Sequence, residues 1–164
     1  MNKEEILKEI KETKEHLANM EKMLKECEYE RWKPEPHEEY YYVNQLSAAS
    51  RAVNDEFDID TARHRTYNCF ETREQAEAEA EKILVRRMLE NIARRLNKGN
   101  KIDWNNDKQF KYFICIDSRD NEIIWDREVQ YISQGIVYCL DINFCNVAIQ
   151  EIGEERLKKY LRGE

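Results

Sequence analysis

The chain has few of the residues that interrupt regular structure, with four Gly and two Pro among 164 residues. A loop-rich or disordered chain needs more of both. No apolar run approaches the roughly 18 residues of a membrane span, and the first five residues lack an apolar signal region. Five cysteines without a CxxC pair favour buried, reduced thiols over a disulfide framework. These absences predict a cytoplasmic globular protein.

Basic residues are also fewer than acidic ones, so the net charge is −7 and the pI is about 5.2. Non-specific nucleic-acid binding depends on Lys and Arg that neutralise phosphates, so we do not expect it here. A basic protein surface remains a compatible partner.

No pattern of catalytic or metal-binding residues stands out. Asp55, Asp58 and Asp60 match no calcium loop, and the Gly that such a loop requires is missing. His64 has no second His at ligand spacing and no Cys or Asp at triad spacing. We therefore expect no metal, no cofactor and no enzymatic activity.

Residues 1–33 are predicted to form a separate helix that Pro34 and Pro36 end. Its apolar positions alternate spacings of four and three, as in a coiled-coil seam. The alternative is a helix that packs on its own domain. We favour self-association into a dimer or higher oligomer through Ile6, Ile10, Leu17, Met20 and Leu24.

Residues 34–164 are predicted to be an α+β domain of two strand–strand–helix units, forming one antiparallel sheet backed by helices. A sequence echo supports this plan: aligning Phe70 with Tyr138 also aligns Ala76 with Phe144. Ala80 then aligns with Ala148. Aromatic and β-branched content predicts strands at 40–43, 51–53, 110–116, 122–126, 129–132 and 136–140.

Helix signals follow the strands of each unit. Thr72 and Gln75 have the spacing of a capping box, which begins a helix that we expect to end near Gly99. Asp141 is a candidate cap for a helix that ends at Gly153, and a short helix over 154–161 follows. The intervening segment 54–60 reads as an acidic surface loop.

The best candidates for a binding surface are cationic and aromatic residues outside the predicted core. Arg pairs bidentately with phosphate or carboxylate, and aromatic rings stack on bases or guanidinium groups. The alternative is that the Arg-rich end of the long helix only compensates the helix dipole. The predicted ligand- or partner-binding residues are Arg63, Arg65, Tyr67, Arg87, Arg94 and Trp104.

Several segments resemble an uncharacterised family of small accessory proteins of phages and prophages of Gram-positive bacteria. The markers are Trp32-Lys33-Pro34, the Tyr-rich strand 39–43, the segment 68–77, the linker Ile102-Asp103-Trp104-Asn105 and the segment 152–160. One departure is that 44–48 lacks the Gly often found after the Tyr-rich strand, so the first hairpin is expected to be altered.

The resemblance implies a phage accessory protein, and many such proteins disarm host defence. We expect a binding protein that acts stoichiometrically inside the host cell, with an anti-defence inhibitor as the leading hypothesis. It could occlude an immune effector such as a CRISPR nuclease, or sequester a nucleotide immune signal. The rival hypotheses are a structural or assembly module and a small nucleotide hydrolase or nuclease.

Overall fold

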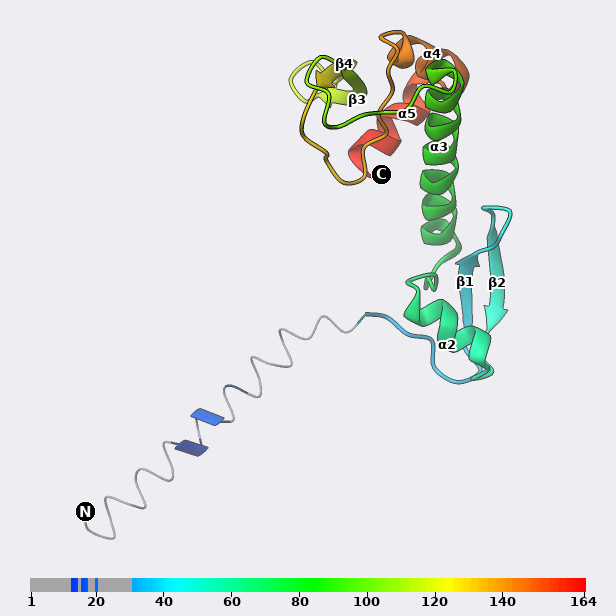
Figure 1. Cartoon of the computed structure of the whole chain (residues 1–164). Helices are drawn as coiled ribbons and strands as arrows, with labels where there is room; N and C mark the ends of the chain where they lie inside the picture. Colours follow the sequence, from blue (N-terminus) through cyan, green and yellow to red (C-terminus); the bar gives the residue numbers. More distant parts are fainter. Residues whose placement is uncertain (1–12, 15, 18–19, 21–30) are drawn as a thin grey trace, which may run out of the picture. The chain divides into compact units, whose positions relative to one another are not determined.

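The computed structural model describes residues 13–14, 16–17, 20 and 31–164, and the chain divides into two units, Met1–Lys33 and Pro34–Glu164 (Figure 1). In the first unit, the described residues 13–14, 16–17 and 20 are helical, and Leu17 and Met20 are exposed. The other predicted seam residues, Ile6, Ile10 and Leu24, lie outside the described residues. The coiled coil therefore stays a prediction.

The second unit begins with a β-hairpin and a short helix. Strand β1 (Glu39–Val43) pairs antiparallel with β2 (Ala49–Val53), and α2 (Asp58–Arg65) follows. The prediction of a loop over 54–60 was wrong at its end, because α2 begins there. Phe57 is an unusual N-cap residue, and Asp60 supplies the cap by accepting a 3.1 Å hydrogen bond from the Phe57 backbone N–H.

The turn between β1 and β2 forms without glycine. Ser47 adopts the left-handed conformation, with φ of 58°, in which glycine is the usual residue. The side-chain oxygen of Asn44 accepts hydrogen bonds from the backbone N–H groups of Leu46 and Ala48 at 2.9 and 3.2 Å. An Asn side chain and a left-handed Ser thus replace the expected Gly.

Helix α3 (Arg73–Asn97) confirms the prediction from the capping box. The Thr72 hydroxyl accepts a hydrogen bond from the Gln75 backbone N–H, and the Gln75 side chain accepts one from the Thr72 N–H. Lys98 ends the helix in the left-handed conformation, immediately before Gly99. Ala76 and Ala80 are buried near its start, and Val85, Leu89 and Ile92 are buried further along.

The second hairpin consists of β3 (Lys111–Asp117) and β4 (Glu122–Glu128), followed by α4 (Phe144–Ile152) and α5 (Glu154–Arg162). The strand predicted over 129–132 is absent, since these described residues form a bend and an extended loop. The strand predicted over 136–140 is reduced to one bridge, at Cys139.

The two halves named by the sequence echo each contain a hairpin, a bridge to its first strand and a later helix, although the bridges differ by one residue from the alignment of Phe70 with Tyr138. In each half, a residue after the hairpin forms a bridge with the first strand, Phe70 with Tyr41 and Cys139 with Tyr112. The aligned helical positions are all buried: Ala76, Ala80, Phe144 and Ala148. The four strands of residues 34–164 form two separate two-stranded sheets, however, so the prediction of one sheet was wrong.

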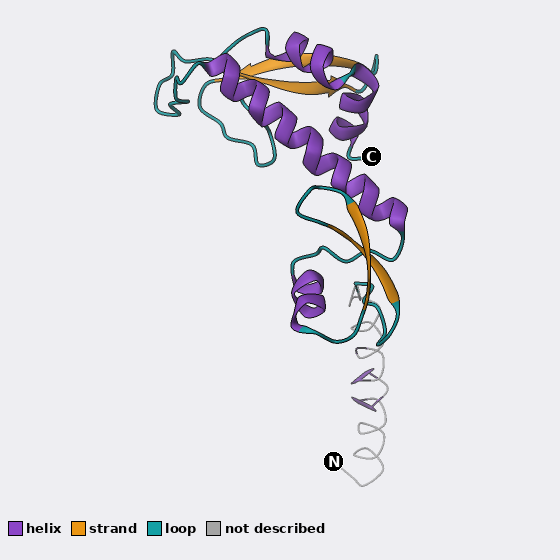
Figure 2. Ribbon diagram, turned by 90° about the vertical axis from the view of Figure 1, so that its right-hand side faces the viewer, coloured by secondary structure: helices purple, strands orange, loops and turns teal. Residues whose placement is uncertain are grey.

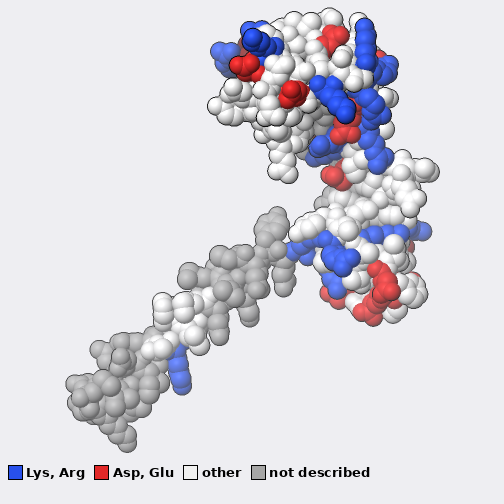
Figure 3. Space-filling view, viewed as in Figure 1, with Lys and Arg blue, Asp and Glu red and all other residues white. Residues whose placement is uncertain are grey.

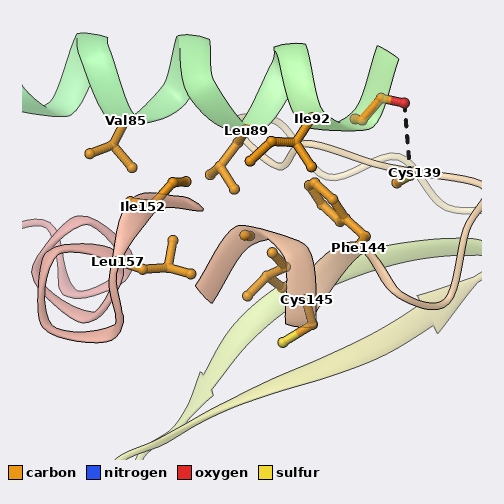
Figure 4. Packing of buried hydrophobic residues seen from close by; sticks show 11 residues of the cluster. Val85, Leu89, Ile92, Cys139, Phe144, Cys145, Ile152 and Leu157 are labelled. Atoms are coloured by element: carbon orange, nitrogen blue, oxygen red, sulfur yellow. Dashed lines mark hydrogen bonds between the residues drawn. The ribbon is translucent and has the colours of Figure 1, made fainter. Parts of the chain in front are cut away.

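The main core lies between α3, the second hairpin and the last two helices (Figure 2). Figure 4 shows α3 above α4 and α5, with the side chains of Leu89, Phe144 and Leu157 between them. Phe144 and Leu157 are almost completely buried. This core holds the C-terminal part of α3, while the N-terminal part of α3 contacts β1 and β2.

Candidate functional site

A groove of about 300 Å³ opens where the β1–β2 turn, the segment before α3 and α3 itself meet. Two of the predicted binding residues, Tyr67 and Arg87, line it, although 20 positions separate them in the chain. Its other lining residues are Val43, Asn44, Ser47, Thr66, Asn68, Phe70, Glu79 and Ile83. We name it the Tyr67–Arg87 groove.

Side-chain amides fix two walls of this groove. Asn68 accepts a 2.7 Å hydrogen bond from the Val43 backbone N–H and donates a 2.8 Å hydrogen bond to the Val43 carbonyl. It therefore pairs with the end of β1 as a neighbouring strand would. Asn44 holds the turn on the other side, as described above, and donates to the Ser50 hydroxyl at 2.8 Å. Both amides are therefore engaged in hydrogen bonds that hold the walls of the groove.

Tyr67 presents an aromatic ring at the groove. Its side chain is 75% exposed, and its φ of 61° places it in the left-handed region, which is rare for a bulky residue. Two backbone hydrogen bonds hold this conformation at the end of α2, from Tyr67 N–H to the His64 carbonyl and from Asn68 N–H to the Arg63 carbonyl. The ring is thus held at the surface by a fixed turn.

Arg87 and Glu79 give the groove its charges. The guanidinium of Arg87 donates a 2.5 Å hydrogen bond to the Ser47 hydroxyl, which links α3 to the β1–β2 turn. Arg87 is exposed, and a guanidinium has five donors, so most of its capacity faces outward. Glu79 lies eight residues earlier on α3 and is the one carboxylate among the lining residues. The groove therefore has a positive and a negative end.

Arg63, another predicted binding residue, has a structural environment. Its guanidinium donates a 2.8 Å hydrogen bond to the Tyr40 hydroxyl, lies 3.6 Å from Asp60 and stacks 3.6 Å from the centre of the Tyr42 ring. The Tyr40 hydroxyl in turn donates to Asp60 at 2.6 Å. Burial, together with the hydrogen bond to Asp60, raises the pKa of Tyr40 to about 12. This buried network attaches α2 to β1.

The remaining predicted residues lie apart from the groove lining. Arg65 and Arg94 are exposed. Trp104 is half-buried and packs edge-on against Tyr138, with 5.0 Å between ring centres. The ammonium of the fully buried Lys111 lies 5.2 Å from the Trp104 ring and donates to the carbonyls of Asn106 and Val129. Trp104 therefore contributes to the packing of two loops.

Sequence reasoning missed Ser47 and Glu79 as groove residues. Ser47 occupies a turn whose conformation is set by Asn44, and Glu79 is one of several acids in the first half of α3. A possible signal was the Asn44-x-x-Ser47 pattern, because Asn and Ser are typical of turns that replace glycine. No local pattern distinguishes Glu79 from its neighbours.

Among residues 31–164 and the few described before them, no group of three or more His, Cys, Asp or Glu side chains could hold a metal ion. No helix in this described part has both the length and the apolar character needed to cross a membrane. Comparison with family models, curated proteins and solved structures finds no match for the chain.

Proposed function

We propose that the protein acts by stoichiometric binding and holds a nucleotide-sized anionic ligand in the Tyr67–Arg87 groove. The observation that carries the proposal is the meeting of an exposed aromatic ring and an exposed guanidinium at one groove of about 300 Å³. This volume lies at the lower end of the range for small-molecule sites. It suits a mononucleotide better than a larger cofactor.

The groups available in the groove match the parts of a nucleotide. Arg87 can pair with a phosphate, and the Tyr67 ring can stack on a base. Glu79 can accept hydrogen bonds from an amino group or a ribose hydroxyl, but it repels a second anion at its own end. A general acid–base mechanism commonly needs a second titratable group, and Glu79 has no carboxylate or His beside it in the lining. These features favour binding over hydrolysis.

The resemblance to phage accessory proteins supplies the biological role. A stoichiometric binder of nucleotides would withhold an immune signal from a host defence system, in the cytoplasm of the infected bacterium. The protein would then need abundance and affinity rather than turnover. The resemblance and the groove chemistry together support an anti-defence inhibitor.

A second candidate function is occlusion of a basic immune effector, and a different surface favours it. Phe57 and Ile59 have exposures of 64% and 54% at the start of α2, between the exposed acids Asp55, Glu56 and Asp58. Exposed apolar anchors with a polar rim are typical of protein interfaces. The acidic rim would complement Lys and Arg on a partner.

Calorimetric titration with AMP, GMP and inorganic phosphate tests the nucleotide proposal. We expect one site per chain, with the nucleotides bound more tightly than phosphate, and unchanged nucleotide recovered afterwards. Tyr67→Leu should weaken AMP binding by about 1–3 kcal/mol, the usual contribution of one stacked base, and should leave phosphate binding unchanged. Arg87→Gln should weaken both.

Arg73→Gln is the matched control, because Arg73 is also exposed on α3 but pairs with Glu77 and does not line the groove. Binding that Tyr67→Leu and Arg87→Gln leave intact would place the ligand elsewhere. Conversion of AMP to products by the pure protein would favour the enzyme class instead. A complete lack of nucleotide binding would leave occlusion through Phe57 and Ile59 as the better candidate.

A further inference from the structure

A row of cationic side chains continues from the groove along α3. Arg87 and Arg94 lie at positions i and i+7 of α3, which fall on one face of a helix, and Lys98 follows as the C-cap residue of α3. Asn91, between them, is uncharged. We name these four residues the α3 stripe. All four are exposed, and Figure 3 shows Lys and Arg gathered over the region of α3.

The stripe differs from the other bases of α3 in its ion pairs. Arg86 lies 3.0 Å from Glu90, and Arg95 lies 2.5 Å from Glu151, so a carboxylate already neutralises each of them. Within the described residues, no carboxylate comes within ion-pair distance of Arg87, Arg94 or Lys98. The stripe is therefore a positive surface in a protein whose net charge is −7.

Compensation of the helix dipole explains only part of the stripe. The dipole acts within the last turn of a helix, where Arg94 lies. Arg87 lies ten residues before the end of α3 at Asn97, which corresponds to about 15 Å. Arg87 also lines the groove, so the stripe connects the binding site with the C-terminal end of the helix.

We propose that the ligand of the groove is a short oligonucleotide whose first nucleotide lies between Tyr67 and Arg87 and whose further phosphates follow the α3 stripe. This inference rests on the proposed function and specifies its ligand. About 10 Å of helix separates Arg87 from Arg94, and about 16 Å separates Arg87 from Lys98. Two or three nucleotides of one strand can span these distances.

The position of Glu79 determines the direction in which the proposed oligonucleotide extends from the groove. Glu79 precedes Arg87 by about two turns of α3, so it repels phosphates from that end of the groove. Additional phosphates are therefore favoured only toward Arg94. Lys98 is the last cation of the α3 stripe, and the net negative charge of the protein opposes a longer polyanion. The ligand should thus be limited to about three nucleotides by charge.

The test compares 5′-phosphorylated adenylates of one, two and three nucleotides, which carry one, two and three phosphates, by calorimetric titration of the full chain. We expect affinity to rise roughly three- to tenfold with each added nucleotide and to stop rising in a 20-nucleotide strand. The dependence of affinity on salt should steepen in the same steps, because each neutralised phosphate releases counterions.

Variants separate the stripe from the groove. Arg94→Gln should remove the gain from the second and third nucleotides, Lys98→Gln should remove only the gain from the third, and both should bind the mononucleotide as the native chain does. Arg86→Gln is the matched control on α3, since its charge is already paired with Glu90. It should change none of the three affinities.

Failure of this inference differs from failure of the proposed function. Equal affinity for one, two and three nucleotides would overturn the oligonucleotide but retain nucleotide binding in the groove. If affinity still rises with oligonucleotide length in the Arg94→Gln, Lys98→Gln double variant, the α3 stripe does not cause that rise. A tri-glutamate peptide that binds as tightly as the trinucleotide would replace the oligonucleotide with an acidic peptide. Absence of binding by all three nucleotides would remove both proposals.

Discussion

The two halves of the folded unit share one plan but are stabilised by different means. In residues 34–80 the largest buried side chain is Tyr40, the buried positions of α3 are alanines, and the polar residues Asn54 and Asp60 are also buried. In residues 81–164, eleven buried apolar residues form one continuous cluster. Hydrogen bonds between buried polar groups thus contribute more to stabilising the first half, whereas apolar packing stabilises the second. The comparison predicts that the halves respond differently to the same kind of mutation.

The largest effect should come from the apolar half. Phe144→Ala removes an almost fully buried ring from between α3, α4 and α5, and should lower the free energy of unfolding by about 3–5 kcal/mol. Urea denaturation measures this change. Ile142→Ala, two residues earlier and 48% exposed, is the control and should change stability by less than about 1 kcal/mol. A loss below about 1 kcal/mol for Phe144→Ala would contradict the comparison.

A smaller loss, from a polar change, should follow in the first half. Asp60→Ala removes the acceptor of both the Tyr40 hydroxyl and the Phe57 N–H and leaves the Arg63 charge without its closest carboxylate. We expect a loss of about 2–3 kcal/mol. Hydrogen exchange should accelerate in β1, β2 and α2 more than in β3 and β4. Uniform acceleration through both hairpins would show that the halves are one cooperative unit.

The pH dependence of stability should also report on the first half. Because folding raises the pKa of Tyr40 to about 12, the native state favours the neutral phenol. The contribution of the neutral Tyr40 phenol to the free energy of unfolding is complete below pH 10, where the unfolded phenol is also neutral. This contribution is lost as pH rises toward 12. This loss is on the order of 2 kcal/mol. Denaturation at several alkaline pH values should show it, and Tyr40→Phe should remove that part of the slope.

The smallest effect should come from a polar contact in the apolar half. Arg156 forms a two-point ion pair with Glu81, and its hydrogen bonds lower the pKa of that carboxyl. Both side chains are partly exposed, so Glu81→Gln should cost less than about 1 kcal/mol. This contribution should fall further at acid pH, as Glu81 becomes protonated. A loss as large as that of Asp60→Ala, measured in the same buffer, would remove the distinction between the halves.

The sequence predicted the elements whose signals are local. Thr72 and Gln75 defined the start of α3, and Gly153 defined the boundary between α4 and α5. The alignment of Phe70 with Tyr138 pointed to two hairpin-and-helix units, but the second bridge to a first strand is at Cys139, one position after Tyr138.

The features that the sequence did not predict depend on contacts between residues far apart in the chain. Helix α2 depends on Asp60, which bonds to Tyr40 twenty positions earlier. The groove depends on Arg87 reaching Ser47 over forty positions, and no local pattern specifies that contact. The predicted strand over 129–132 failed for a related reason: the buried ammonium of Lys111 binds the Val129 carbonyl and holds that segment as a loop.

The scarcity of glycine has a consequence for how the groove would receive a ligand. Among the described residues, six with side chains take the left-handed conformation, and two of them, Ser47 and Tyr67, line the groove. A side chain at such a position restricts the backbone more than glycine would, so these corners have few alternative shapes to explore. The walls would therefore need little ordering on binding the proposed ligand, and less of the binding free energy would be lost as conformational entropy. A Tyr67→Gly, Ser47→Gly variant would therefore have a more flexible groove and would lose more conformational entropy on binding the proposed ligand.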